Sequence, residues 1–208
     1  MISFINNLER LNRKERYFLI GMALGNPEFK LNSEFRQKLS EKYCLAVPDT
    51  AFVAIDYHLN WIFSAAALAF DSPVRDNIFN NKGGIIDGTQ EDVDLLVAFE
   101  DKSSMNHVIM LEAKGFTAFS NRQFTHKMDR LKSIFGEKGN RWPKVKPYFG
   151  LISSRESGKL KTNICPSWLK VEGRIPWFEM PLPNNRLILC GCDKLGRPNQ
   201  ERAFWTVK

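Results

Sequence analysis

The sequence predicts an α/β fold in which helices flank a mixed β-sheet, with an N-terminal helical segment before the sheet and a C-terminal β-rich extension after it. Three observations predict this class. Apolar residues recur at helical spacing through the first 70 residues. Two strand-like runs, 93–99 and 108–114, are separated by a polar segment, which predicts an antiparallel hairpin. A helix and another apolar run follow, and a strand, helix, strand order implies parallel pairing.

The length of 208 residues and the apolar content of 43% are sufficient for one main domain with a substantial core. We expect three parts within this domain. Residues 1–48 form a helical segment that packs on the core, and residues 49–160 form the core itself. Residues 161–208 form a β-rich extension of the same domain.

Three helices are predicted in the N-terminal third of the chain, over residues 4–24, 32–45 and 49–70. The second helix opens on Asn32 or Ser33, and both residue types are good N-caps. The third helix is apolar nearly all round. We therefore expect it to lie deep in the fold.

The later elements follow from turn residues and apolar runs. Residues 71–92 are rich in Pro, Gly, Asn and Asp, which suggests turns around a short strand or two. After the hairpin, apolar spacing predicts an amphipathic helix over residues 120–136, with Ser120 or Asn121 as cap. Residues 147–154 then predict a buried strand. The tail suggests three short strands, at 175–183, 186–192 and 202–208.

The 30 basic residues exceed the 23 acidic ones, and the sequence pI is about 9.3. Nucleic acid is the first polyanionic partner that this charge suggests. The four cysteines are too few and too scattered for a disulfide framework, and the N-terminus lacks a signal-peptide pattern. The longest apolar stretch contains Asp56, His58 and Asn60, which would be expensive in lipid. We therefore expect a cytoplasmic protein that does not span a membrane.

The pattern Glu-x-Lys occurs three times, beginning at Glu28, Glu100 and Glu112. The first lies between predicted helices and the second in the hairpin loop. Only Glu112 and Lys114 end a core strand, where alternate side chains point to the same face. In an antiparallel hairpin this strand end lies beside the start of the preceding strand, which carries Asp94. The alternative is a salt bridge at an exposed strand end.

The hairpin register decides whether these charges meet. Asp94 must lie opposite residue 112 or 114, and not opposite Ala113, to share the face of Glu112 and Lys114. Two carboxylates this close repel unless a cation sits between them, and such oxygen ligands suit Mg²⁺, with Mn²⁺ as a substitute. Lys114 can orient a metal-bound water or offset charge developing on phosphate. These parts suit metal-assisted phosphodiester hydrolysis.

With the helix that follows them, these residues resemble the core of the PD-(D/E)XK nuclease superfamily, which has a restriction-endonuclease-like fold. The resemblance covers roughly residues 49–154, and the order of elements carries as much of it as the short motif. It implies that Asp94 and Glu112 ligate a metal and that the carbonyl of Ala113 adds a ligand. It also implies that Lys114 is the catalytic lysine.

Two positions differ from the usual family pattern. Val93 stands where many members have a proline. Asp56 is the candidate for the acid that the family often adds from the helix before the sheet, although a glutamate is commoner there. The alternative is that Asp56 is hydrogen-bonded to His58, Asn60 or a neighbouring element. In either case we expect a cation or a hydrogen-bond network around it, because burying an unpartnered carboxylate is costly.

The predicted amphipathic helix adds candidates for substrate contact. Gln123 resembles a glutamine in the catalytic site of RecB-like members, and Lys127 stands where those members tend to carry tyrosine. Gln123, Lys127 and Arg130 share one helical face and are candidates to contact phosphates, the alternative being a solvated polar face. Trp142, in the basic loop 137–146, is a candidate to stack on a base, the alternative being core packing.

Together these features predict a Mg²⁺-dependent nuclease, most directly an endonuclease acting on double-stranded DNA in restriction, defence or repair. One alternative is a catalytically inactive module that binds nucleic acid, and another is a regulatory protein-interaction domain that retains the fold. The sequence leaves open DNA versus RNA and the assembly, for which a homodimer is one option.

Overall fold

The structure is a computed structural model that describes residues 2–25, 29–81, 83–88, 91–183, 185, 187–201 and 203–207. Its helices are α1 (Phe4–Leu11), α2 (Glu15–Met22), α3 (Ser33–Tyr43), α4 (Leu59–Phe70) and α5 (Asn121–Phe135), with 3₁₀ turns at Thr162–Ile164 and Ser167–Leu169. Its strands are β1 (Phe52–His58), β2 (Asp92–Glu100), β3 (Asn106–Lys114), β4 (Val145–Ser153), β5 (Trp177–Glu179), β6 (Leu189–Cys192) and β7 (Phe204–Val207).

Strands β1 to β5 form one mixed sheet in the order β1-β2-β3-β4-β5. The β1–β2 and β2–β3 pairs are antiparallel, whereas the β3–β4 and β4–β5 pairs are parallel. Helix α5 connects β3 to β4, as a strand, helix, strand order requires for parallel neighbours. The predictions of an α/β class, a β2–β3 hairpin and a parallel crossover are confirmed.

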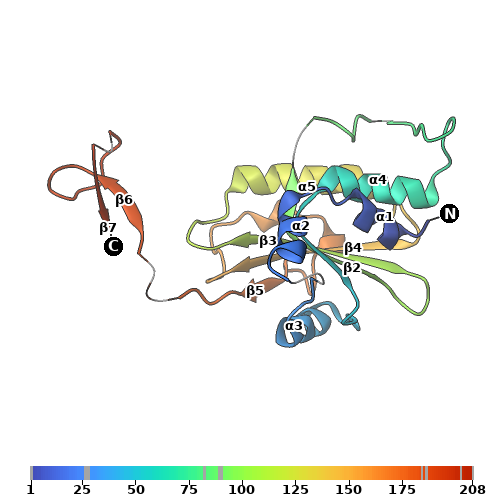
Figure 1. Cartoon of the computed structure of the whole chain (residues 1–208), viewed down its shortest axis with the longest axis horizontal. Coiled ribbons are helices and arrows are strands. Elements are labelled where there is room, and N and C mark those ends of the chain that lie inside the picture. The colour runs from blue at the N-terminus through green and yellow to red at the C-terminus, as the bar shows by residue number, and fades with distance from the viewer. Residues whose placement is uncertain are drawn as a thin grey trace.

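Helices cover both faces of this sheet (Figure 1). Helices α1, α4 and α5 lie on one face, and α3 lies on the other. The core on the first face includes Phe4, Ile62, Leu96, Met110 and Leu131. The core on the second face includes Leu39, Tyr43, Val97 and Ile109. Because side chains alternate along a strand, Leu96 and Met110 lie in the first core while Val97 and Ile109 lie in the second.

The predicted caps are confirmed at two helices. The side chain of Asn32 accepts backbone hydrogen bonds at the start of α3, and that of Ser120 does so at the start of α5. The predicted single helix over 4–24 is wrong, because α1 ends at an extended Asn12 and α2 begins three residues after it, at Glu15. The Asn12 side chain accepts a hydrogen bond from the backbone of Lys14, which stabilises the break.

The predicted helix over residues 49–70 is wrong in its first half. Residues 52–58 form strand β1, and α4 begins only at Leu59. The segment is rich in β-branched and aromatic residues, which fit a pleated surface, and pairing with β2 satisfies its backbone. An apolar run of this length cannot be assigned to strand or buried helix by periodicity alone. Helix α4 keeps the predicted deep position, and both Leu59 and Ile62 are fully buried.

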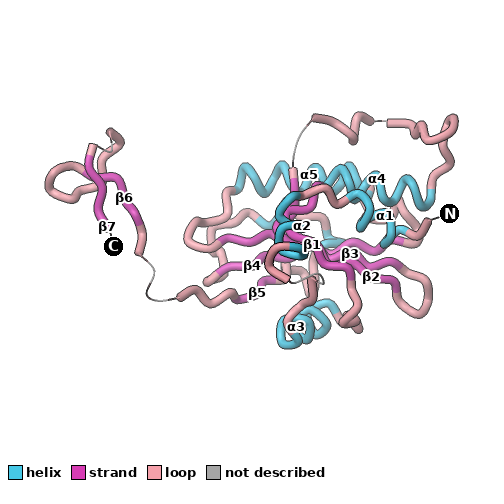
Figure 2. The backbone as a smooth tube through the Cα atoms, viewed as in Figure 1, coloured by secondary structure: helices cyan, strands magenta, loops and turns pink. Residues whose placement is uncertain are grey.

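The strands predicted elsewhere form in part. Within the described part of residues 71–91, an isolated bridge between Arg75 and Ile78 replaces the expected short strands. In the tail, β5 joins the main sheet, so the sheet extends past the expected core boundary at residue 160. Strands β6 and β7 pair with each other in a separate antiparallel ribbon, which lies apart from the main sheet in Figure 2.

Two further expectations bear on the whole chain. All four cysteines are free thiols, as expected from their spacing. Among the helices of the described residues, none has the length and apolar character needed to cross a membrane.

Candidate active site

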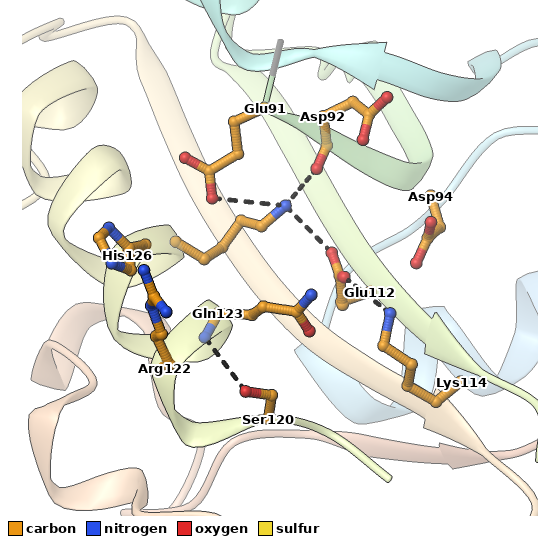
Figure 3. Close-up of a pocket in the computed structure, with 10 residues that line it drawn as sticks. Glu91, Asp92, Asp94, Glu112, Lys114, Ser120, Arg122, Gln123 and His126 are labelled. Atoms are coloured by element: carbon orange, nitrogen blue, oxygen red, sulfur yellow. Dashed lines mark hydrogen bonds and ion pairs between the residues drawn. The ribbon is translucent and has the colours of Figure 1, made fainter. Parts of the chain in front are cut away.

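A cavity of about 730 Å³ opens where β2 begins, β3 ends and α5 begins. Figure 3 shows carboxylates and amines from these three elements facing one another across it. The lining consists of Glu91, Asp92, Asp94, Glu112, Lys114, Ser120, Arg122, Gln123, His126 and Lys127. Five of these ten were expected from the sequence: Asp94, Glu112, Lys114, Gln123 and Lys127.

The hairpin register puts Asp94 on the same face as Glu112. The ladder ends at the pair of Leu95 with Leu111, and continuing its register by one position puts Asp94 opposite Glu112. A carboxylate oxygen of Asp94 accepts a hydrogen bond from the backbone N–H of Ala113, with an N–O distance of 2.6 Å. This bond fixes the orientation of the Asp94 side chain. The predicted register is therefore confirmed, and the two carboxylates share one cavity.

The carboxylate of Glu112 is largely buried and lies between two lysines. Lys114 Nζ donates a hydrogen bond to its Oε1 at 3.5 Å, and Lys127 Nζ lies 3.1 Å from its Oε2. Burial raises the pKa of Glu112, and the nearby charge of Asp94 raises it further, although the two lysines act in the opposite direction. Burial is the largest of these effects, so the neutral form of Glu112 is favoured relative to an exposed glutamate.

Lys127 lies inside the site and not on a solvated helix face. Its residue exposure is only 8%, and its ammonium lies 3.8 Å from Glu91 Oε1 in addition to its contact with Glu112. It also donates a hydrogen bond to the carbonyl of Asp92. The alternative of a solvated polar face is therefore wrong for Lys127, and its contact with substrate phosphate stays a prediction. The sequence spacing could have predicted this burial. Lys127 follows Phe124 by three positions and therefore falls on the same buried stripe of α5.

The first turn of α5 supplies the other wall of the cavity. The cap Ser120 accepts the backbone N–H of Gln123, at 3.5 Å, which starts the helix at this point. Gln123 is exposed to the cavity and lies on the side of Glu112 in Figure 3, as expected from the sequence. Arg122 and His126 also line the cavity, and no sequence pattern had singled them out.

Asp56 lies on strand β1 and not on a helix, and it is not among the described residues that line the cavity. Its backbone has a left-handed conformation, with φ of 50°, and the β1–β2 ladder is interrupted there. The expected cation is present, because Arg16 lies 2.6 Å from its carboxylate. The structure therefore gives Asp56 a structural ion pair in place of the expected metal-site role.

Arg130 is directed away from the cavity. Its guanidinium donates hydrogen bonds to the side chain of Asn60 and the carbonyl of Ile85, and it lies 3.6 Å from Asp87. These contacts tie α5 to α4 and to the loop that follows α4. The expected contact of Arg130 with substrate phosphate is contradicted, since its side chain is committed to the fold.

Trp142 is part of the core, so the alternative of core packing is confirmed. It is only 4% exposed, its ring packs edge-on against Phe63, and its indole N–H donates to the carbonyl of Ile134 at 3.1 Å. A base cannot reach this ring, so the expectation of stacking is wrong. Of the other two Glu-x-Lys patterns, Glu100 lies at the opposite end of β2 from the cavity and Glu28 lies outside the described residues.

The donor set fits a hard divalent cation. Within the described residues, no group of three or more His, Cys, Asp or Glu side chains is arranged to hold a metal. Magnesium sites, however, commonly use one or two carboxylates and complete their octahedron with water and substrate phosphate. Asp94 and Glu112 supply two such carboxylates, and both line the same cavity. Mg²⁺ or Mn²⁺ therefore fits here.

Comparison of the chain with protein-family models, with curated proteins and with solved structures gives no match.

Proposed function

We propose that the chain is a Mg²⁺-dependent nuclease of restriction-endonuclease-like fold, with double-stranded DNA as its preferred substrate. The observation that carries this proposal is the β2–β3 register. It brings Asp94 onto the face of Glu112 and Lys114, at one end of the sheet and in one cavity. A salt bridge at an exposed strand end would explain Glu112 and Lys114, but it would require neither a second acid beside them nor a cavity.

In this proposal Asp94 and Glu112 hold the metal, and the carbonyl of Ala113 is a further candidate ligand. The hydrogen bond from the Ala113 N–H fixes the Asp94 carboxylate, so that one oxygen is left for another ligand. A bound Mg²⁺ would supply Lewis-acid stabilisation of charge on phosphate and a more acidic water. Lys114, which already donates to Glu112, is placed to orient the attacking water and to offset negative charge as it develops.

Substrate contacts come from the rim of the cavity. Arg122, Gln123 and His126 line its outer wall on the first turns of α5. Their donors suit phosphate oxygens, which proteins contact mainly through Arg, Lys and polar side chains. The net formal charge of +7 adds a general attraction for a polyanion. A helix N-terminus at the same place favours anions as well.

A cleavage assay tests the proposal. Wild type is incubated with duplex, single-stranded and branched DNA and with RNA, in Mg²⁺, in Mn²⁺ and in EDTA. Glu112→Ala and Lys114→Ala should abolish the metal-dependent cleavage and retain the far-ultraviolet circular dichroism of wild type. Lys102→Ala is a matched control, because Lys102 completes the Glu-x-Lys pattern outside the cavity. Undiminished cleavage by both active-site variants would refute the proposal.

A second candidate function is nucleic-acid binding without catalysis. One observation favours it: Lys127 already neutralises one oxygen of Glu112, so the site holds part of its counter-charge without a metal. Such a module would bind DNA with a steep salt dependence and show no turnover with Mn²⁺. The cleavage assay separates the two candidates, since only the nuclease produces new ends.

A further inference from the structure

Lys127 occupies an oxygen-lined position in the candidate active site. Its ammonium is surrounded by three oxygens from two sides of the cavity. These are Glu112 Oε2 at 3.1 Å, Glu91 Oε1 at 3.8 Å and the carbonyl of Asp92, which accepts a hydrogen bond. The Lys127 side chain is 10% exposed, whereas the side chains of Glu112 and Glu91 are 20% and 27% exposed.

Two carboxylates and a carbonyl are the ligands that a hard divalent ion uses. Glu112 Oε2 is buried and has no hydrogen-bond partner of good geometry among the described residues, although the Lys127 ammonium lies beside it as an ion pair. An ammonium donates along three fixed directions, whereas a metal ion accepts oxygens from a wider range of directions. The oxygen set therefore offers a cation position that the lysine fills incompletely.

The position of Lys127 is fixed by the fold. It lies on the buried stripe of α5, between Phe124 and Leu131. The residue is buried, and its ammonium contacts the oxygens at the cavity. The other oxygen of Glu112 faces a different cation, because Lys114 Nζ donates to Oε1. The two oxygens of Glu112 therefore face different lysines: Oε2 faces the buried Lys127, and Oε1 faces Lys114.

We propose that the Lys127 ammonium takes the place of a second divalent ion, so that the site holds one metal ion only. This inference depends on the proposed nuclease function, because it assumes that Asp94 and Glu112 hold the first ion. Lys127 is then a positioning residue. It holds the inner oxygen of Glu112 and the start of β2 while the opposite side of Glu112 remains available. Many two-metal hydrolases instead use a second cation to stabilise the leaving oxygen.

The number of Mn²⁺ ions bound per chain tests this inference without measuring activity. Isothermal calorimetry, or the electron paramagnetic resonance signal of free Mn²⁺, gives that number for each variant. Wild type should bind one ion. Lys127→Met keeps the length of the side chain and removes its charge, so the three oxygens should accept a second ion. Lys127→Gln provides an independent neutral variant if the methionine variant folds poorly.

Lys132→Met is the matched control, because Lys132 is on the same helix and pairs with Asp129 outside the cavity. It should bind one ion, as wild type does. Two ions on wild type would overturn the inference, and so would a single ion on a folded neutral variant at position 127. No ion on wild type would instead contradict the proposed function. The two failures are therefore distinguishable.

Discussion

At the scale of single residues, Asp94 has two separable tasks. Its charge belongs to the proposed metal site, and one of its oxygens accepts the backbone N–H of Ala113 at 2.6 Å. Asparagine can still accept that hydrogen bond but brings no negative charge, whereas alanine removes both. The pair of substitutions therefore separates chemistry from local structure.

We predict that Asp94→Asn abolishes cleavage with almost no loss of stability. We predict that Asp94→Ala also abolishes cleavage and in addition lowers the free energy of unfolding by about 1–3 kcal/mol, because the Ala113 N–H loses its partner. Urea denaturation of both variants beside wild type measures the difference. Equal stability of the two variants would show that the hydrogen bond does not hold this strand end.

Glu112 gives a prediction about pH. Because burial raises its pKa, protons compete with the metal at a higher pH than they do at an exposed glutamate. The Mn²⁺ affinity of wild type should therefore fall as the pH is lowered from neutral toward about pH 5. Calorimetry across this range measures it. A constant affinity would contradict the role of Glu112 as a ligand, and Glu112→Gln, which has no titrating carboxyl there, should bind weakly at every pH.

At the scale of elements, the sequence patterns were informative where burial is one-sided. The turn residues and apolar runs predicted β2, β3 and β4, and the stripe containing Phe124, Met128 and Leu131 predicted α5. Antiparallel hairpin geometry is sufficient to predict that Asp94 lies beside Glu112. Five of the ten residues that line the cavity could be predicted from these elements.

The errors have physical causes. Residues 52–58 form a strand that pairs on one edge with β2, and an apolar segment of this kind has no period that separates strand from helix. The residue type of Lys127 suggests a polar helix face. Its position on α5 nevertheless places it in the buried stripe. Glu91, Asp92, Arg122 and His126 come together only through the three-dimensional arrangement of β2 and α5.

The contacts of Arg130 give a prediction about the join between α5 and α4. Its guanidinium serves acceptors on Asn60 and Ile85 and lies near Asp87. Arg130→Met should therefore lower the free energy of unfolding by about 1–3 kcal/mol, since buried acceptors lose their donor. Urea denaturation checks this, with Lys132→Met as the control.

DNA affinity in EDTA should be nearly unchanged in Arg130→Met, because the side chain does not face the cavity. A large loss of affinity with unchanged stability would mean that Arg130 contacts the substrate after all.

At the scale of the whole molecule, the sheet separates two cores and leaves its functional end at the β2–β3–α5 corner. The excess of basic residues gives the chain a net formal charge of +7. Binding to DNA should therefore weaken steeply with salt. For six or more phosphate contacts, we predict roughly a thousandfold loss of affinity between 50 and 200 mM salt.

Fluorescence anisotropy of a labelled duplex in EDTA measures this salt dependence. An affinity that is independent of salt would contradict an electrostatic mode of binding.

In the proposed function, Asp94, Glu112 and Lys114 together form a metal-dependent phosphodiesterase site. The most direct measurement is the single-turnover rate of duplex DNA cleavage in Mg²⁺ for wild type and for Lys114→Ala. We predict cleavage by wild type that requires the metal, and a rate at least about a hundredfold lower in the variant, as loss of one charge-stabilising donor produces. Equal metal-dependent rates for the two proteins, or no cleavage by wild type in Mg²⁺ or Mn²⁺, would contradict the claim.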